Sequence, residues 1–87
     1  MYTAEIVLKN ETGLHARPAK MLVDECTKYV SDITIIKNEQ EFNAKSILGI
    51  MSMGAMKGDK LIFQAVGKDE KEAIEGLVTL TENNFGE

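Results

Sequence analysis

Apolar residues recur at every second position from Tyr2 to Leu8, with Ala4 and Ile6 on the same side as both. This period of two predicts a half-buried β-strand over Tyr2–Leu8. The apolar spacing then becomes that of a helix, which predicts a helix over Ala16–Lys28. The residues that set this helical period are Ala19, Leu22, Val23 and Cys26.

Alternation returns after this helix. Ile33 and Ile35 predict a second strand, and a polar turn over Lys37–Gln40 leads into a third strand around Phe42. Asn38 tolerates the positive φ of a tight hairpin turn, but the glycine preferred after it is missing.

A short helix, a fourth strand and a long helix complete the pattern. Ser46 is a favoured N-cap residue, and it opens an apolar stretch that Gly54 and Gly58 close. The last helix begins near Asp69, which is spaced from Glu72 like the two residues of a capping box. The apolar positions of the fourth strand are Leu61, Phe63 and Ala65, and those of the last helix include Ala73, Ile74, Leu77 and Val78.

The predicted order is therefore strand, helix, strand, strand, helix, strand and helix. Helices that connect strands in a short mixed chain favour an α+β fold, a two-layer open-faced sandwich with helices on one face of the sheet. A chain of 87 residues has room for one core, so we expect a single domain over residues 1–87.

Composition excludes several classes of protein. A lone cysteine, Cys26, rules out an intrachain disulfide and indicates a reducing compartment, so the cytoplasm is the expected location. One histidine and one cysteine are too few for a zinc site, and we expect neither metal nor other cofactor. The first residues do not form a signal peptide, and no stretch reaches the roughly 18 apolar residues of a membrane span.

Charge argues against nucleic acid as a partner. Ten basic and fourteen acidic residues give a net charge of −4. Residues 1–60 carry eight charges of each sign, so the acidic excess lies in residues 61–87. Phosphate contacts need a net basic surface, which this chain does not provide.

The residues best suited to chemistry lie in Gly13–Ala19, where the first strand has ended and the first helix begins. A helix N-terminus offers unpaired backbone N–H groups and the positive end of the helix dipole, both of which favour an anion. Pro18 suits a first turn because it has no N–H to leave unpaired. His15 is the only imidazole of the chain, and Arg17 adds a permanent cation two residues later.

This combination predicts a site that accepts a phosphoryl group. The neutral imidazole of His15 is a nucleophile, and the backbone N–H groups of Ala16 and Arg17, with the Arg17 guanidinium, would hold the phosphate. Phosphoryl transfer depends mostly on positioning and charge stabilisation, so little else is required. The alternative is a surface or capping histidine beside an ordinary solvated arginine. Which residue caps the helix stays open, because the residue before Pro18 avoids helical geometry.

The run Gly-Leu-His-Ala-Arg-Pro-Ala over Gly13–Ala19 resembles the active-site signature of the HPr family, the histidine-containing phosphocarriers of the bacterial sugar phosphotransferase system. A second run, Lys45–Gly54, is similar to the regulatory serine segment of that family in Gram-positive-type bacteria. Length and element order agree with the family along the whole chain. The resemblance implies a four-stranded antiparallel sheet with three helices on one face.

The resemblance also implies a carrier without turnover of its own. His15 would accept the phosphoryl group on Nδ1 from phospho-Enzyme I and pass it to sugar-specific Enzyme IIA domains, while Arg17 steadies the phosphate. Ser46 would be phosphorylated by HPr kinase/phosphorylase, and it would cap its helix whether or not it is modified. A catabolite-control repressor would be a further partner.

Partners would dock on the first two helices, as in the family that the chain resembles, and the chain would act as a monomer. Methionine and aliphatic residues at helical spacing also fit a core, but so short a second helix cannot bury all of them. The expected docking residues are Lys20, Met21 and Asp24 on the first helix and Ile47, Leu48 and Met51 on the second.

Two other functions stay open. In the first, the chain acts mainly through phosphorylated Ser46 as a corepressor of a catabolite-control transcription factor, the role of a family branch that lacks the active-site histidine. The presence of His15 favours the carrier over this alternative. In the second, the chain is an unrelated small α+β protein. An independent enzyme has least support, since no paired carboxylates, glycine-rich nucleotide loop or metal-ligand set is visible.

Overall fold

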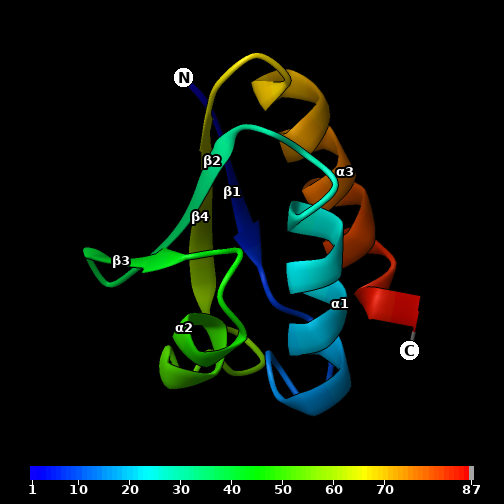
Figure 1. Ribbon diagram of the computed structural model, residues 1–87. Helices are drawn as coiled ribbons and strands as arrows, with labels where there is room; N and C mark the ends of the chain where they lie inside the picture. The colour runs from blue at the N-terminus through cyan, green and yellow to red at the C-terminus, as the bar shows by residue number, and fades with distance from the viewer. Residues whose placement is uncertain (87) are drawn as a thin grey trace.

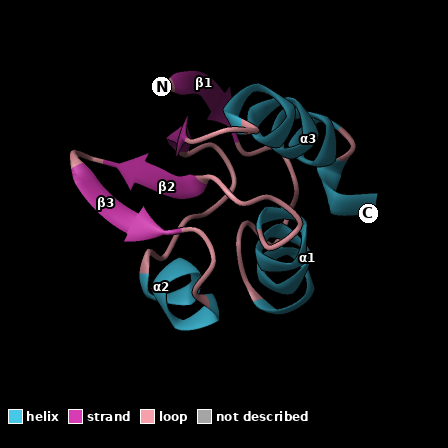
Figure 2. Cartoon of the chain, turned by 45° about the horizontal axis from the view of Figure 1, so that its top comes forward, coloured by secondary structure: helices cyan, strands magenta, loops and turns pink. Residues whose placement is uncertain are grey.

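The computed structural model describes residues 1–86 and confirms the α+β open-faced sandwich. Within these residues, four antiparallel strands form one sheet in the order β1-β4-β2-β3, and three helices cover one of its faces (Figure 1, Figure 2). In chain order the elements are β1 (Tyr2–Val7), α1 (Ala16–Cys26), β2 (Asp32–Lys37), β3 (Gln40–Asn43), α2 (Ile47–Ser52), β4 (Lys60–Val66), α3 (Glu70–Glu82) and the short 3₁₀ turn η1 (Asn84–Gly86).

The core lies between the sheet and the helices, and β4 contributes most to it among the strands. Leu61, Phe63 and Ala65 have no exposed surface, and they share one side of β4 because alternate residues of a strand face opposite sides. β4 lies between β1 and β2, so Phe63 stands opposite Ala4 on one side and Ile35 on the other. The alternation predicted for this strand is confirmed.

The β2–β3 hairpin turns through Asn38 and Glu39, which are both left-handed, with φ of 51° and 69°. Two-residue turns with positive φ at both central positions match the right-handed twist of the strands that they join. Lys37 pairs with Gln40 directly across the turn, so the hairpin forms although glutamate stands where glycine is preferred.

The first helix ends two residues earlier than the predicted end at Lys28. α1 stops at Cys26 and Thr27 caps it, after which the Tyr29 N–H bonds only three residues back, to the Cys26 carbonyl. Such tight bonds take the chain out of the α-helix. The Tyr29 carbonyl then accepts a hydrogen bond from Lys45 Nζ at 2.7 Å. This bond to a residue outside the helix holds the chain where it leaves α1.

Cys26 belongs to the core, as its place in the apolar stripe predicts. Its side chain has no exposed surface. Burial raises the pKa of its thiol to about 12, so the reactive thiolate is scarce at neutral pH.

The capping box expected from Asp69 and Glu72 does not form at Asp69. Asp69 is the N-cap of α3 by position, but its side chain makes no capping hydrogen bond. Its carboxylate instead accepts hydrogen bonds from the backbone N–H groups of Val30 and Ser31, both at 3.0 Å, and from the Ser31 hydroxyl at 2.5 Å. The start of α3 is thereby tied to the loop between α1 and β2.

We expect Asp69→Asn to lower the Tm at neutral pH and to flatten its dependence on pH. The hydrogen bond from the Ser31 hydroxyl, helped by the two backbone amides, holds the pKa of the Asp69 carboxyl below its ordinary value of 3.8. A carboxyl with a lower pKa in the folded state contributes stability above its unfolded-state pKa, and this contribution is lost as the pH falls through the folded-state pKa. The difference in Tm between wild type and variant, followed by circular dichroism, should be largest above the ordinary pKa of 3.8 and shrink as the pH falls below it.

Asp24→Asn is the control for this experiment, because it removes one exposed ion pair with Lys20 and should change the Tm little. A difference between wild type and Asp69→Asn that stayed constant from neutral to acid pH would contradict this role of Asp69.

Candidate functional site

His15 joins the β1–α1 loop to α1 and is the N-cap residue of that helix. Its backbone is extended, with φ of −110° and ψ of 152°, and its exposed side chain makes no capping hydrogen bond. The capping position that the sequence left open therefore falls on His15, while the imidazole takes no part in capping. The ring is accessible to another protein and lies at the positive end of the α1 dipole.

The backbone at Ala16 is left-handed, with φ of 47°. This conformation costs a residue with a side chain about 1–2 kcal/mol. Strain of this kind persists where the surrounding structure fixes it, and it gathers at functional sites. Here it turns the chain between the exposed His15 and the buried Pro18, which lies in the first turn of α1 as predicted.

The first turn of α1 suits an anion. The N–H groups of Ala16 and Arg17 belong to this turn, where amides have no partner inside the helix. The turn contains no acidic residue, so no carboxylate there competes for these donors or opposes the helix dipole.

The Arg17 side chain is exposed and lies next to the C-terminal turn η1, an element that sequence analysis did not place there. η1 packs beside α1 (Figure 1), and its Phe85 is buried. A Cβ placed on Gly86 would lie 3.6 Å from Arg17 Nη2, so the guanidinium is within van der Waals distance of this turn.

The loop before His15 is built around a buried asparagine that sequence analysis missed. Asn10 is 4% exposed, and its Nδ2 donates to the Gly13 carbonyl at 2.8 Å, while the Gly13 N–H donates to the Asn10 carbonyl at 3.2 Å. These two bonds close a four-residue turn, in which Asn10 Oδ1 is buried without a partner. Asparagine followed three residues later by glycine is a turn signal that would have identified it.

Ser46 is the N-cap of α2, as the sequence predicts. Its Oγ accepts a hydrogen bond from the Gly49 N–H at 3.0 Å. The hydroxyl therefore has a structural role in the unmodified protein, and the residue is half-buried at the start of the helix.

α2 buries one side and exposes the other. Ile50 has no exposed surface, whereas Ile47, Leu48 and Met51 are 40%, 79% and 42% exposed. The expectation that so short a helix cannot bury all its apolar residues is confirmed. We call Ile47, Leu48 and Met51 the α2 patch.

The residues expected to dock partners on α1 differ in exposure. Lys20 and Asp24 are exposed and form an ion pair with an N–O distance of 2.7 Å, whereas Met21 is half-buried and packs against the core. Asp24 and Glu25 make this edge of α1 acidic, and the ion pair with Lys20 partly balances that charge. α1 and α2 are neighbours (Figure 2), so the two expected docking regions belong to adjacent elements.

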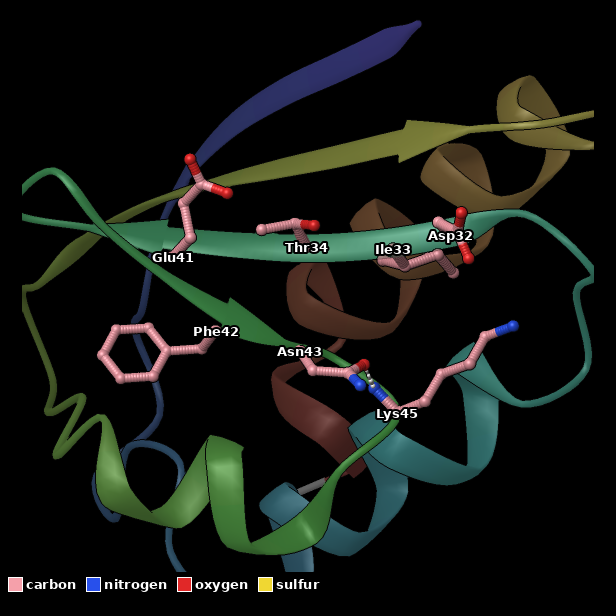
Figure 3. Close-up of a pocket in the computed structure, with 7 residues that line it drawn as sticks. All are labelled: Asp32, Ile33, Thr34, Glu41, Phe42, Asn43 and Lys45. Carbon is pink, nitrogen blue, oxygen red and sulfur yellow. Dashed lines mark hydrogen bonds between the residues drawn. The ribbon is translucent and has the colours of Figure 1, made fainter.

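A groove of about 350 Å³ lies on the β2–β3 part of the sheet (Figure 3), and neither His15 nor Arg17 lines it. Its lining residues are Asp32, Ile33, Thr34, Glu41, Phe42, Asn43 and Lys45. His15 and Arg17 are exposed on the surface instead. This exposure suits a group that is exchanged between proteins.

No helix within residues 1–86 has the length and apolar character needed to cross a bilayer. No group of three or more His, Cys, Asp or Glu side chains in this range is arranged to hold a metal ion.

Comparison with known proteins identifies the family. Residues 2–83 match the family model described as the PTS HPr component phosphorylation site. The chain is 42% identical over 71 residues to the phosphocarrier protein HPr of Mycoplasma capricolum subsp. capricolum, a match that covers 82% of this chain and 80% of the relative. It is 40% identical over 87 residues to the multiphosphoryl transfer protein of Haemophilus influenzae, where the match covers 97% of this chain but the chain spans only 17% of that longer protein.

A solved structure of similar sequence has the same fold. The crystal structure of HPr-C-His from Thermoanaerobacter tengcongensis superposes with a TM-score of 0.98 at 48% identity, covering 100% of this chain and 98% of that chain. Sequence and structure therefore agree over almost the whole length. The chain belongs to the HPr family, the phosphocarrier proteins of the phosphotransferase system, which carry a phosphoryl group without enzymatic turnover of their own.

Proposed function

We propose that residues 1–87 act as one phosphocarrier domain, in which His15 accepts a phosphoryl group from phospho-Enzyme I and delivers it to sugar-specific Enzyme IIA domains. The observation that carries this proposal is the place of His15, exposed at the N-cap of α1 beside a first turn without an acidic residue. An imidazole there is accessible to a partner, and the phosphate that it receives lies at a helix end that favours anions.

The transfer exchanges one nitrogen–phosphorus bond for another. The lone pair on Nδ1 of the neutral His15 ring attacks the phosphorus of the donor phosphohistidine. The bond from phosphorus to the donor's ring nitrogen breaks, and its electron pair returns to that nitrogen. No proton leaves His15, because its other ring nitrogen keeps its hydrogen. The phosphoryl group then moves to Enzyme IIA by the same exchange.

Positioning and charge are what this chain adds to the transfer. The first-turn N–H groups of Ala16 and Arg17 are donors for the phosphoryl oxygens. The Arg17 guanidinium carries five donors in a planar fork and lies on a side chain two residues from His15, so it would rotate from its place beside Gly86 onto the phosphate.

Partners are expected to dock on the α2 patch and on the neighbouring edge of α1 formed by Lys20, Met21 and Asp24. Exposed aliphatic and methionine side chains suit a protein that binds several partners in turn. Such exchange needs interfaces that release quickly, in the range below about 1,200 Å². We therefore propose a monomer that works in the cytoplasm and meets Enzyme I and Enzyme IIA in succession.

Ser46 is our proposed regulatory site, phosphorylated by HPr kinase/phosphorylase and then able to bind a catabolite-control repressor. A phosphate there adds about −1.5 to −2 charges directly before Ile47 of the α2 patch. A helix N-terminus tolerates this charge, so the fold should persist. The same charge repels a phosphorylated donor that approaches the patch. Because His15 is present and exposed, no observation favours the corepressor role as the main function.

The deciding experiment is incubation with Enzyme I and phosphoenolpyruvate, followed by mass spectrometry of the labelled site. We expect an acid-labile, base-stable adduct on His15 and none in His15→Ala, which should fold normally because the residue is exposed. Phosphate acceptance by a folded His15→Ala would show that another residue is the nucleophile.

Arg17→Ala should accept the phosphoryl group on the order of a hundredfold more slowly than wild type, and the rate for Arg17→Lys should fall between the two.

Leu48→Asp should weaken binding to Enzyme I without unfolding the protein. Leu48 is 79% exposed, so the free energy of unfolding should change by no more than about 0.5 kcal/mol. A charge within an apolar contact should raise the Kd, measured by calorimetry, roughly tenfold or more. Val30→Asp is the control, because Val30 is 75% exposed but lies in the α1–β2 loop, at the other end of α1 from α2 (Figure 1). If Leu48→Asp and Val30→Asp raised the Kd equally, the α2 patch would not be part of the interface with Enzyme I.

Ser46→Asp should slow the phosphorylation of His15 by Enzyme I, and Ser46→Asn should not. Asp and Asn are about equally good N-caps, so this pair of variants differs in charge and not in helix stability. Salt screens exposed charges, so the difference in initial rate should be severalfold at low ionic strength and narrow at high ionic strength.

Ser46→Ala separates capping from charge in the same assay. It loses the hydrogen bond from the Gly49 N–H, so it should be about 1 kcal/mol less stable, yet it should accept phosphate at nearly the wild-type rate. Equal rates for the Asp and Asn variants at low salt would mean that Ser46 and His15 do not share a docking face.

A further inference from the structure

The loop that presents His15, residues 8–14, is held by a second loop that has no part in the chemistry. This second loop covers residues 53–59 and connects α2 to β4. The two loops meet first where β1 ends. There the Leu8 N–H donates to the Asp59 carbonyl at 3.0 Å, and the Leu8 carbonyl accepts from the Gly58 N–H at 2.8 Å.

Directly before His15 the contact between the loops is tightest. The Leu14 N–H donates to the Ala55 carbonyl at 3.0 Å. A Cβ on Gly13 would overlap the Ala55 carbonyl oxygen and would lie 2.7 Å from Met56 Cα, which is closer than real Cβ atoms approach backbone. Only glycine therefore fits at position 13 without moving one loop away from the other.

The second loop is itself fixed by side chains. The Met56 N–H donates to the Asp59 carboxylate at 2.8 Å, which closes the turn that faces Gly13. Lys57 also forms an ion pair with Glu11 of the first loop, with an N–O distance of 2.6 Å. Loops are commonly the mobile parts of a protein, but these two restrain each other through both backbone and side chains.

We infer that residues 55–59 of the second loop are a positioning element for His15, and that Gly13 is the positioning residue through which they act. This inference rests on the proposed role of His15 as the phosphoryl acceptor. The attacking nitrogen must meet the donor phosphorus closely and in line, and a misplacement of about 1 Å can cost on the order of a hundredfold in rate. Leu14 is the only residue between Gly13 and His15, so a displacement of Gly13 from Ala55 carries the imidazole with it.

The same loop follows α2 directly, so it connects the α2 patch with the acceptor histidine. When a partner docks on the α2 patch, His15 therefore lies at a constant distance and orientation from that patch. The chain runs from Met51 of the patch to Ala55, whose carbonyl accepts the hydrogen bond from Leu14, the residue directly before His15.

Gly13→Ala and Gly54→Ala form a matched pair for the test. Both glycines are left-handed, with φ of 61° and 66°, so both alanines carry a similar conformational cost. A Cβ at Gly54 has nothing within 4 Å, whereas one at Gly13 meets the second loop. We measure the kcat and KM of Enzyme I with this protein as the phosphoryl acceptor. Gly13→Ala should lower that kcat on the order of a hundredfold with a much smaller change in KM, and it should shift the NMR signals of the His15 ring. Gly54→Ala should keep the wild-type kcat and ring signals.

A second pair tests the second loop even where Gly13→Ala does not fold. Asp59→Ala removes the acceptor of the Met56 N–H, whereas Asp59→Asn keeps an oxygen in that place. Both variants lose the long ion pair with Lys37, at 3.8 Å, so its effect cancels in the comparison. We expect a severalfold lower kcat and shifted His15 ring signals in Asp59→Ala, and recovery of both in Asp59→Asn.

If Gly13→Ala and Gly54→Ala had the same kcat and the same His15 ring signals, the inference would be wrong. If Gly13→Ala does not fold, equal kcat values and ring signals in Asp59→Ala and Asp59→Asn would overturn it instead. The ring signals also separate this inference from the proposed function. If the wild-type chain accepts no phosphate from Enzyme I, the proposed function fails, while the signals still report whether the second loop positions His15.

Discussion

The burial of Leu61, Phe63 and Ala65 against the helices is the contact on which the rest of the structure depends. These residues lie on β4, the strand that pairs with both β1 and β2, so the sheet and the helical layer meet along it. The loop that enters β4 is also the loop that contacts the segment before His15. The position of the exposed His15 side chain thus depends on the core. β4 anchors the loop over residues 53–59, and that loop in turn holds the segment directly before His15.

The elements of the fold and the place of the candidate site at a helix start could be predicted from the sequence because both depend on local patterns. Periods of two and of about 3.6 residues give strands and helices, and the segment around His15 combines a helix start with an imidazole and a cation. The details that sequence analysis missed depend on residues far apart. The Asp69 carboxylate bonds to Ser31, and Lys45 bonds to the Tyr29 carbonyl, and nothing near either residue in the chain signals its partner. The left-handed backbone at Ala16 likewise depends on what surrounds it and not on its own side chain.

An exposed histidine that accepts a phosphoryl group, as we propose for His15, supplies only half of an active site. Enzymes that transfer charged groups exclude water and surround the reacting atoms with fixed dipoles. His15 has a helix end and Arg17 on its own side and solvent on the other. In the transfer that we propose, a docking partner must therefore complete the surroundings of the phosphorus atom. This division of the site between two proteins is the physical reason why a carrier has no turnover alone.

The order of the strands also bears on how the chain is made. β1 pairs with β4, so Tyr2 stands opposite Ala65, and the ribosome delivers one partner long before the other. Helices form from local contacts during synthesis, but β1 waits without its partner until β4 has emerged. Thr3 and Glu5 alternate with the apolar residues of this strand, and a charge on a waiting strand discourages pairing with neighbouring chains. The polar residues of β1 thus reduce aggregation of the newly made chain before β1 joins the folded sheet.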